Sequence, residues 1–314
     1  MTVNTDITKE LKAVEKLIKS DINKEKTILG LYNYIFKSDG KKIRSRLNLI
    51  ASSSSKNSDR YKLASIIELL HTATLVHDDV VDNASTRRGA VSVNSLWSNA
   101  HGVLIGDYIY SKAFMLMVEI GKKDILAELA DATNDISQGE LIQLDAISNI
   151  EISLNKLKKI SYFKTGRLFE ASAKTGAMLA GANKNFIKNI SESAKNIGIL
   201  FQIKDDLLDY SNSSKTGKQS FQDLKEGKIT YPFFFALKNS SQKEKKQLIS
   251  FLGNQRLNEK KALALISKLN GLIKTQQLAE KFYTSSINAA KTINNQFIRQ
   301  EMIELANIAL NREK

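Results

Sequence analysis

The amino-acid sequence predicts an all-α fold. A single proline and 15 glycines among 314 residues leave few positions at which a helix is forced to end. Apolar residues recur at spacings of three and four almost throughout the chain, as over residues 66–75, whereas the alternation typical of strands is hard to find. Both observations favour long amphipathic helices, and the hydrophobic content of 42% can fill a sizeable core.

The apolar spacing delimits the expected helices in order along the chain. They are residues 5–20, 24–37, 41–55, 60–83, 93–120, 123–146, 153–180, 184–212, 229–238, 241–252, 257–269 and 271–311. Ser, Asn, Gly and Lys crowd between two apolar helices over residues 210–227, which predicts a lid-like loop there. Since no repeat of fixed period is present, residues 1–314 are predicted to form a single domain, one large helical bundle.

The composition excludes several kinds of site. The chain has no cysteine, so it forms no disulfide or thiolate metal site, and oxygen or histidine must hold any metal. Hard cations are therefore expected. Residues 1–20 are polar and carry acids, and no later apolar run approaches ~20 residues. These features predict a cytoplasmic protein without a signal or transit peptide.

The formal net charge of +14 is explained either by solvation of helix surfaces or by binding of an anionic partner. Scattered lysines such as Lys122, Lys123 and Lys243 can simply solvate helix surfaces, because a basic excess by itself favours solubility and attracts anions. The sequence has no recognised nucleic-acid motif and no interleaving of aromatic and basic residues. It therefore argues against nucleic acid as a partner and leaves anionic small molecules open.

Two acidic clusters of the same form lie far apart in the chain. Residues 77–82 read HDDVVD and residues 204–209 read KDDLLD, each at the C-terminal end of an apolar helix. Aspartates four apart lie on one helix face within about 6 Å, so one divalent ion could bridge them. Crowded carboxylates repel one another and require a cation. One such cluster alone is also typical of a solvated acidic helix end, but two clusters of the same form indicate a functional site.

Basic residues that suit phosphate oxygens flank these clusters. Mg²⁺ prefers oxygen ligands and commonly bridges carboxylates to substrate phosphates, while Arg and Lys bind phosphate directly. The basic groups are Lys41, Lys42, Arg44 and Arg46, then Arg87 and Arg88, then Lys164 and Arg167, and finally Lys218 and Lys228. Each group alone fits a surface salt bridge, but their place beside the acids predicts Mg²⁺-dependent binding of a diphosphate.

Both clusters lie within longer motifs of a known family. IELLHTATLVHDDVVDNASTRRG at 67–89 resembles the first aspartate-rich region of the trans-isoprenyl (polyprenyl) diphosphate synthases, and FQIKDDLLDY at 201–210 resembles the second. Further similar stretches are DGKKIRSRL at 39–47, GDYIYSKAF at 106–114, QGELIQL at 138–144, KTGRLFEAS at 164–172, DLKEGKIT at 223–230 and ANIALNRE at 306–313. The chain is most similar to bacterial octaprenyl diphosphate synthases of quinone pathways. The resemblance implies the isoprenoid synthase bundle around a central substrate cavity.

The resemblance also implies roles for individual residues. The implied Mg²⁺ ligands are Asp78, Asp82 and Asp205, with Asp79, Asp206 and Asp209 as supporting or water-mediated partners. The positions that match contacts to the allylic diphosphate are Arg87, Lys164, Lys218 and Lys228, with Thr165 and Gln202 beside the reacting carbons. The positions that match the isopentenyl diphosphate site are Lys41, Arg44, His71 and Arg88. Without its motif, His71 would be interpreted as a core histidine.

Three positions depart from the family pattern. Asp39 stands where a glycine is usual, Ser45 where a proline is usual, and Phe221 where the lid loop usually has a glycine. Because glycine often marks backbone torsions that other residues resist, the departure at Phe221 concerns the backbone conformation of the loop.

The implied reaction is head-to-tail condensation of isopentenyl diphosphate with an allylic diphosphate, for which farnesyl diphosphate is the expected primer. Metal ions and basic side chains stabilise the departing diphosphate, the isopentenyl double bond attacks the allylic cation, and the released diphosphate accepts the proton. The resemblance also implies a homodimer, with at most peripheral membrane contact for product release. The alternatives are a short-chain synthase, a class I terpene cyclase and a non-catalytic subunit of a heteromeric synthase.

Product length is predicted from the residues that precede the first cluster. Thr74, Ala73 and Leu70 lie four, five and eight residues before Asp78, near the same helix face, and each helical turn descends about 5.4 Å. In the resembling family, short-chain enzymes carry aromatic residues at this level and long-chain enzymes carry small ones. Ala73 also fits simple close packing of two helices. The small residues predict a long polyprenyl product, stopped by deeper side chains such as Leu70 and Leu129.

Overall fold

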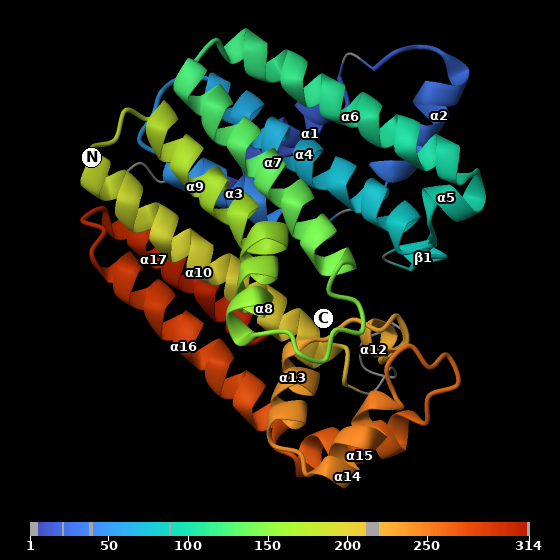
Figure 1. The fold of residues 1–314 in the computed structure, drawn as a ribbon. Helices are drawn as coiled ribbons and strands as arrows, with labels where there is room; N and C mark the ends of the chain where they lie inside the picture. The colour runs from blue at the N-terminus through green and yellow to red at the C-terminus, as the bar shows by residue number, and fades with distance from the viewer. Residues whose placement is uncertain (1–5, 21, 38–39, 88, 212–219, 313–314) are drawn as a thin grey trace. The chain divides into compact units, whose positions relative to one another are not determined.

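The computed structural model of the chain describes residues 6–20, 22–37, 40–87, 89–211 and 220–312. In these ranges the strands are β1 (Thr86–Arg87) and β2 (Ala90–Val91), which form one antiparallel hairpin, and the remaining regular structure is helical. The predicted all-α class is confirmed (Figure 1).

The helices follow one another in the order of the chain. They are α1 (Ile7–Ile18), α2 (Lys26–Ile35), α3 (Ile43–Ala51), α4 (Asp59–Val81), α5 (Val93–Leu96), α6 (Asn99–Ile120), α7 (Lys123–Leu144), α8 (Leu154–Ser161), the π-helix η1 (Tyr162–Gly166), α9 (Arg167–Leu179), α10 (Lys184–Leu208), α12 (Gln222–Lys225), α13 (Tyr231–Lys238), α14 (Gln242–Ile249), α15 (Glu259–Lys268), α16 (Gly271–Lys291) and α17 (Gln296–Leu310).

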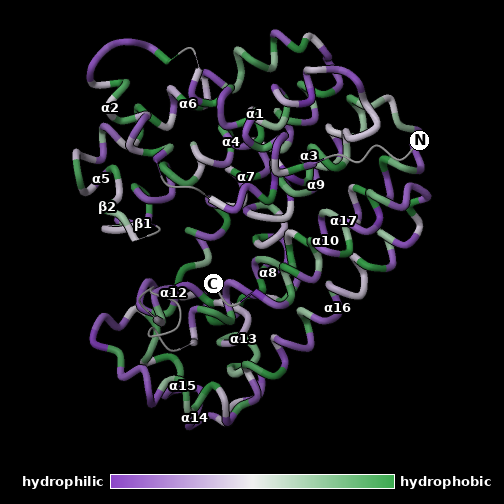
Figure 2. The backbone as a smooth tube through the Cα atoms, turned by 180° about the vertical axis from the view of Figure 1, so that it is seen from behind, coloured by the Kyte–Doolittle hydropathy of each residue, from purple (hydrophilic) through white to green (hydrophobic). Residues whose placement is uncertain are grey.

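Backbone contacts divide the chain into two compact units. Unit 1 comprises Met1–Thr133 and Ala171–Ile190, and unit 2 comprises Asn134–Glu170 and Ser191–Lys314. In both units, hydrophobic and hydrophilic residues are interleaved along the helices, as amphipathic segments require (Figure 2). The prediction of a single domain stays a prediction.

Helix α4 forms the centre of unit 1, where it packs against α1, α3 and α6. Its residues Ile66, Ile67, Leu69 and Leu70 point in different directions around the helix, yet all four are fully buried. A helix that is buried on all sides is a core helix. Because each buried Leu or Ile contributes about 1.5–3 kcal/mol, this segment anchors the first acidic cluster firmly.

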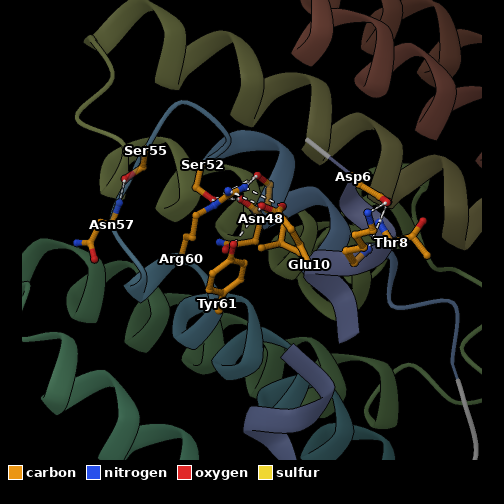
Figure 3. Close-up of polar contacts among 11 residues, drawn as sticks. Asp6, Thr8, Glu10, Asn48, Ser52, Ser55, Asn57, Arg60 and Tyr61 are labelled. Atoms are coloured by element: carbon orange, nitrogen blue, oxygen red, sulfur yellow. Dashed lines mark hydrogen bonds and ion pairs between the residues drawn. The ribbon is translucent and has the colours of Figure 1, made fainter. Parts of the chain in front are cut away.

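A buried ion pair fixes the N-terminal end of α4 (Figure 3). The Arg60 guanidinium binds both carboxylate oxygens of Glu10 on α1, at 2.6 and 3.0 Å, and also donates to the carbonyl oxygen of Leu49 on α3 at 2.8 Å. Burial raises the pKa of Glu10, while Arg60 opposes that rise. Arg60 therefore ties three helices together, and its role is structural.

In unit 2, α13 packs against α15 and α16, and α16 packs against α17. Pro232 lies in the first turn of α13, where its missing N–H breaks no helical hydrogen bond. A Cβ atom on Gly271 would lie 2.3 Å from the carbonyl oxygen of Pro232, so glycine is required where α16 begins. Tyr231 and Phe233 fill the core around this contact.

Two of the predicted helices are each divided in the structure. The segment 93–120 forms α5 and α6, because the Ser98 side chain caps α6 by accepting from the His101 N–H. The segment 271–311 forms α16 and α17, because the Asn295 side chain caps α17 in the same way through the Ile298 N–H. Both caps are residue types that favour helix starts, and the apolar spacing obscured them.

Two further segments differ from the expectation. The predicted helix 153–180 contains the π-helix η1 between α8 and α9, and the predicted loop 210–227 contains the short helix α12. Within the described residues, no helix is long and apolar enough to cross a membrane.

Candidate metal and diphosphate site

The first acidic cluster lies at the C-terminal end of α4, where the sequence placed it. Asp78 and Asp79 belong to the last turn, and Asp82 is the C-cap. The carbonyl end of a helix dipole carries roughly half a negative charge, which adds to the charge of the three carboxylates. This end of α4 therefore attracts cations strongly.

Arg87 supplies one of those cations. On strand β1, its Nε and Nη2 atoms lie 2.7 and 2.5 Å from Oδ1 of Asp79. Asp79 is buried, and burial raises the pKa of its carboxyl group, while the hydrogen bond from Arg87 acts in the opposite direction. The β-hairpin, which the sequence did not predict, thus brings Arg87 to the cluster.

A second basic group gathers beside α4, two turns before the cluster. Nη1 of Arg44 on α3 lies 3.1 Å from Nε2 of His71, so the structure brings together two residues predicted for the isopentenyl site. Lys42 pairs with Glu15, and Lys41 is exposed. This grouping of cations with an imidazole can hold a diphosphate.

Ser45 shows what replaces the usual proline of this segment. Its hydroxyl group is fully buried and lies 3.0 Å from both the carbonyl oxygen of Ala64 and Oε2 of Glu68, so α3 is joined to α4 by polar contacts. Proline has no side-chain donor to make these contacts. The departure at Ser45 is therefore accommodated inside unit 1.

Helix α6 lies against α4 next to the first cluster. A Cβ atom on Gly106 would lie 2.2 Å from Nε2 of His77, so glycine is needed where the His77 ring meets α6. The ring of Tyr110 stacks on His77 at 5.8 Å between centroids. Burial, followed by the charge of Asp78, raises the pKa of Tyr110 to about 12. Sequence reasoning did not select Tyr110, although the GDYIYSKAF stretch contains it.

The predicted chain-length residues lie on the core side of α4. Ala73 and Leu70 are fully buried, and so is Leu129 on α7. Thr74 is half-buried and donates to the carbonyl oxygen of His71 at 2.7 Å. The small volumes of Ala73 and Thr74 at this level agree with the packing of α4 against α6.

The second acidic cluster lies at the C-terminal end of α10 in unit 2. Asp206 is buried, and its oxygens accept from Nε2 of Gln202 at 2.9 Å and from the backbone N–H of Tyr231 at 3.2 Å. The hydroxyl group of Thr165 donates to Oε1 of Gln202 at 2.7 Å. Burial, followed by the charge of Asp223, raises the pKa of Asp206 to about 8. The structure thus brings Thr165 and Gln202 together, and their place beside the reacting carbons stays a prediction.

Asp209 has one satisfied and one unsatisfied oxygen. Oδ1 accepts the Gln222 N–H at 2.9 Å, whereas Oδ2 is buried and has no hydrogen-bond partner among the described residues. Burial and the charge of Asp223 raise the pKa of Asp209 to about 8. Such an orphaned oxygen is costly unless a proton or a cation meets it.

Asp223 is a member of this cluster that sequence reasoning missed. Burial raises the pKa of its carboxyl group, and the charges of Lys228 and Lys164 lower it. The charge of Asp223 in turn acts on Asp206 and Asp209. The signal was available, because Asp223 begins the DLKEGKIT stretch at 223–230.

Phe221 adopts the backbone conformation expected of the glycine that it replaces. Its φ is +60° and its ψ is 25°, in the left-handed region that favours glycine. Its ring is buried and packs edge-on against Tyr210, with 5.1 Å between centroids. The left-handed turn also directs the Phe221 N–H to the carbonyl oxygen of Asp209 at 2.8 Å.

Lys164 and Thr165 both lie in the π-helix η1. Nζ of Lys164 lies 2.8 Å from Oε2 of Glu140 and also contacts Gln143. A Cβ atom on Gly139 would lie 2.7 Å from the side chain of Phe163, so glycine allows α7 to approach this turn. Single π turns occur frequently at functional sites, because they redirect side chains within a helix.

Two further predicted site residues of unit 2, Lys228 and Asp205, each form an ion pair. Lys228 is buried and pairs with Glu226 at 2.7 Å. Asp205 pairs with Arg312 near the C-terminus at 2.7 Å. Arg88 and Lys218, which the sequence also predicted as site residues, lie outside the described residues.

The donor atoms fit a hard divalent cation. They are carboxylate oxygens, the ligands that Mg²⁺ prefers, and the buried Oδ2 of Asp209 lacks a partner among the described residues. In the described ranges, however, no three Asp, Glu or His side chains are already gathered closely enough to hold a metal ion.

The chain is similar to several known proteins. The model of the polyprenyl synthetase family matches residues 25–269. The chain is 32% identical to the octaprenyl diphosphate synthase of Escherichia coli (strain K12), over 99% of this chain and 98% of that protein. A decaprenyl diphosphate synthase from Rhodobacter capsulatus superposes with a TM-score of 0.92 at 29% identity, over 98% and 97% of the two chains. A polyprenyl synthase from Caulobacter crescentus CB15, complexed with calcium and isoprenyl diphosphate, gives 0.90 at 30% identity, over 98% and 95%.

Proposed function

The chain belongs to the polyprenyl synthetase family, and from this premise we propose that it is a long-chain trans-polyprenyl diphosphate synthase. It joins isopentenyl diphosphate head-to-tail to an allylic diphosphate, for which farnesyl diphosphate is the expected primer. Relatives named octaprenyl, decaprenyl and nonaprenyl diphosphate synthase support a long product. Because those names span several lengths, the octaprenyl product and its use in a quinone pathway are the finer part of the proposal.

The observation that carries the proposal is that both acidic clusters end a helix and have basic residues beside them. Arg87 binds Asp79 in unit 1, and the charges of Lys228 and Lys164 act on Asp223 in unit 2. Carboxylates interleaved with cations suit a diphosphate that arrives with divalent metal. We infer that the metal is Mg²⁺, held by Asp78, Asp82 and Asp205.

The reaction needs no protein nucleophile. When bound, the divalent cations stabilise the diphosphate as it leaves the allylic carbon. Lys164 and Lys228 bind the oxygens of that leaving group, and Thr165 and Gln202 lie beside the carbon that carries the positive charge. Arg44, His71 and Lys41 hold isopentenyl diphosphate so that its double bond attacks this carbon. The C–O bond of the allylic diphosphate breaks first, and the isopentenyl double bond then forms the new C–C bond at the allylic cation. The cation left by this addition loses a proton to form the new double bond, and the released diphosphate accepts that proton.

The test is prenyl transfer by the purified protein alone, with Mg²⁺, farnesyl diphosphate and isopentenyl diphosphate. Asp78→Ala and Asp205→Ala should each lower turnover by orders of magnitude while the fold persists, because each removes a carboxylate from a shared charge site. Asp131→Ala is the matched control, since Asp131 is exposed on α7. Near-normal turnover in both site variants would refute the proposal. An inactive wild-type protein would favour a non-catalytic subunit.

We further propose that the enzyme is a homodimer that forms through α6. Leu104, Met115 and Val118 follow one face of this helix and expose 67%, 67% and 69% of their surface. The opposite face, with Ile109 and Ala113, is buried. An apolar stripe of this kind on a helix typically marks a protein interface.

The dimer proposal is tested by the molecular mass in solution. The double variant Leu104→Lys and Met115→Lys should dissociate, because two charges would then be buried without partners. Ile273→Lys is the matched control, since Ile273 is 57% exposed on α16. A double variant that keeps the wild-type mass in analytical ultracentrifugation contradicts the proposal.

A further inference from the structure

The last described residue of the chain reaches the second acidic cluster. Helix α17 ends at Leu310, and Arg312 follows two residues later. Its Nη1 atom lies 2.7 Å from Oδ1 of Asp205, at the end of α10.

The guanidinium group of Arg312 is held from a second side. Its central carbon lies 4.0 Å above the centre of the Phe201 ring. Phe201 and Asp205 are four residues apart on α10 and therefore share one helix face. One planar guanidinium can thus stack on the ring and meet the carboxylate together, which lysine cannot reproduce.

Burial distinguishes this contact from an ordinary surface ion pair. The Arg312 side chain is only 13% exposed, and that of Asp205 is 33% exposed. Exposed pairs contribute little because water screens them and both side chains must be ordered. Here the stacking on Phe201 restricts the arginine side chain before it meets the carboxylate.

Asp205 differs from its acidic neighbours in its partner, because it contacts Arg312 as an ion pair, whereas the neighbours accept hydrogen bonds. Asp206 accepts from Gln202 and Tyr231, and Asp209 accepts from the backbone of Gln222. These are neutral donors, whereas Asp205 meets a full positive charge. At a helix end crowded with carboxylates, that charge offsets the repulsion acting on Asp205.

We propose that Arg312 is a positioning residue, which holds Oδ1 of Asp205 so that the other oxygen is oriented to bind the divalent cation. The proposal rests on the proposed function only in taking Asp205 as a metal ligand. Ligating carboxylates commonly keep one oxygen for a donor outside the metal, and that donor sets their orientation. The chemistry expected of the ligand is a divalent cation that accompanies a diphosphate.

The experiment measures cation binding directly, in addition to activity. Mn²⁺ binding to the full-length protein with inorganic diphosphate is followed by electron paramagnetic resonance, using wild type, Arg312→Ala and Arg312→Lys. Loss of a residue that contacts a metal-ligating side chain typically weakens metal binding about 10–100-fold, which is the effect expected for Arg312→Ala. Arg312→Lys should fall between the two, because it keeps the charge and loses the stacking. Arg299→Ala is the matched control, since Arg299 on α17 donates to the Ile293 carbonyl oxygen at 3.0 Å, away from the acidic cluster.

A combined variant separates positioning from a general effect on folding. In an Asp205→Asn background, Arg312→Ala should cause no further loss of Mn²⁺ binding, because the carboxylate that it positions is already gone. In prenyl transfer, Arg312→Ala should raise the Mg²⁺ concentration for half-maximal rate by a similar factor and leave the KM for isopentenyl diphosphate within about twofold.

Three outcomes overturn the proposal. The first is Mn²⁺ binding by Arg312→Ala that is as tight as that of wild type or tighter, which would make Arg312 a bystander or a competitor of the metal. The losses in the double variant could be additive, which would mean that Arg312 acts elsewhere. Wild-type protein that binds no Mn²⁺ in the presence of diphosphate would show that Asp205 is no ligand. Failure of the proposed function is distinct, since it would appear as Mn²⁺ binding without prenyl transfer.

Discussion

The backbone at Phe221 allows a prediction in which two opposing effects can be compared. A non-glycine residue in the left-handed region costs roughly 1–2 kcal/mol, and Phe221 has a φ of +60°. Its ring is only 3% exposed and packs on Tyr210. Truncating a buried phenylalanine costs about 3–5 kcal/mol. Because lost packing exceeds relieved strain, Phe221→Gly should lower the free energy of unfolding by about 1–4 kcal/mol.

The comparison with alanine isolates the backbone contribution. Phe221→Ala loses the same ring and keeps the unfavourable φ. Glycine gains about 1–2 kcal/mol from the torsion and loses about 0.4–1 kcal/mol through the greater freedom of its unfolded chain. Phe221→Gly should therefore be more stable than Phe221→Ala by roughly 0.8 kcal/mol, the difference between the midpoints of the two ranges, which is the reverse of the usual order.

Urea denaturation of both variants provides the measurement, and Leu224 provides a matched control. Leu224 is fully buried in α12, three residues away, at a helical position. There the usual order should hold, with Leu224→Ala more stable than Leu224→Gly by about 0.5–1 kcal/mol. If Phe221→Ala equals or exceeds Phe221→Gly in stability, the backbone argument is wrong.

Three other predictions concern the candidate site. Burial raises the folded-state pKa of Asp206 to about 8 from an ordinary 3.8, so between these pH values the folded state binds more protons than the unfolded state. The stability of the metal-free protein should therefore fall as pH rises from about 4 to about 8. Calorimetry should show a weaker pH dependence of stability for Asp206→Asn, and an unchanged slope would contradict the burial argument. Arg44→Ala should raise the KM for isopentenyl diphosphate far more than that for the allylic primer, and equal effects in steady-state kinetics would mean that the assignment is wrong. Ala73→Tyr should place a ring about one turn below the cluster, so chromatography of extracted products should show mainly farnesyl or geranylgeranyl lengths, and unchanged products would remove the main physical support for a long chain.

Local patterns determined what could be predicted about the fold. Spacings of three and four residues located the helices that end in the acidic clusters, although α4 and α10 end at Val81 and Leu208, before the predicted ends at 83 and 212. The sequence has Phe221 where the family usually has glycine, which raised the question of a strained backbone torsion. In the structure, the φ of Phe221 is +60°, in the left-handed region. These features depend on neighbours within a few residues along the chain.

Several features of the candidate site were beyond sequence reasoning. The π turn that carries Lys164 depends on the fit of Gly139 against Phe163, which lie on different helices. The inclusion of Asp223 in the second cluster depends on burial, because only a desolvated carboxylate acts so strongly on its neighbours. Neither burial nor contact between helices is visible in a residue pattern.

Arg312 shows most clearly the difference between what a residue pattern reveals and what only helix packing decides. The sequence by itself determined an all-α chain of the polyprenyl synthetase family with two aspartate clusters, since these follow from helical periodicity and contiguous motifs. Only the tertiary structure decided which cation meets Asp205, because Arg312 is 107 residues away along the chain (312 − 205). Such a pairing is set by how α10 and α17 pack, and the strength of an ion pair depends on the burial that packing creates.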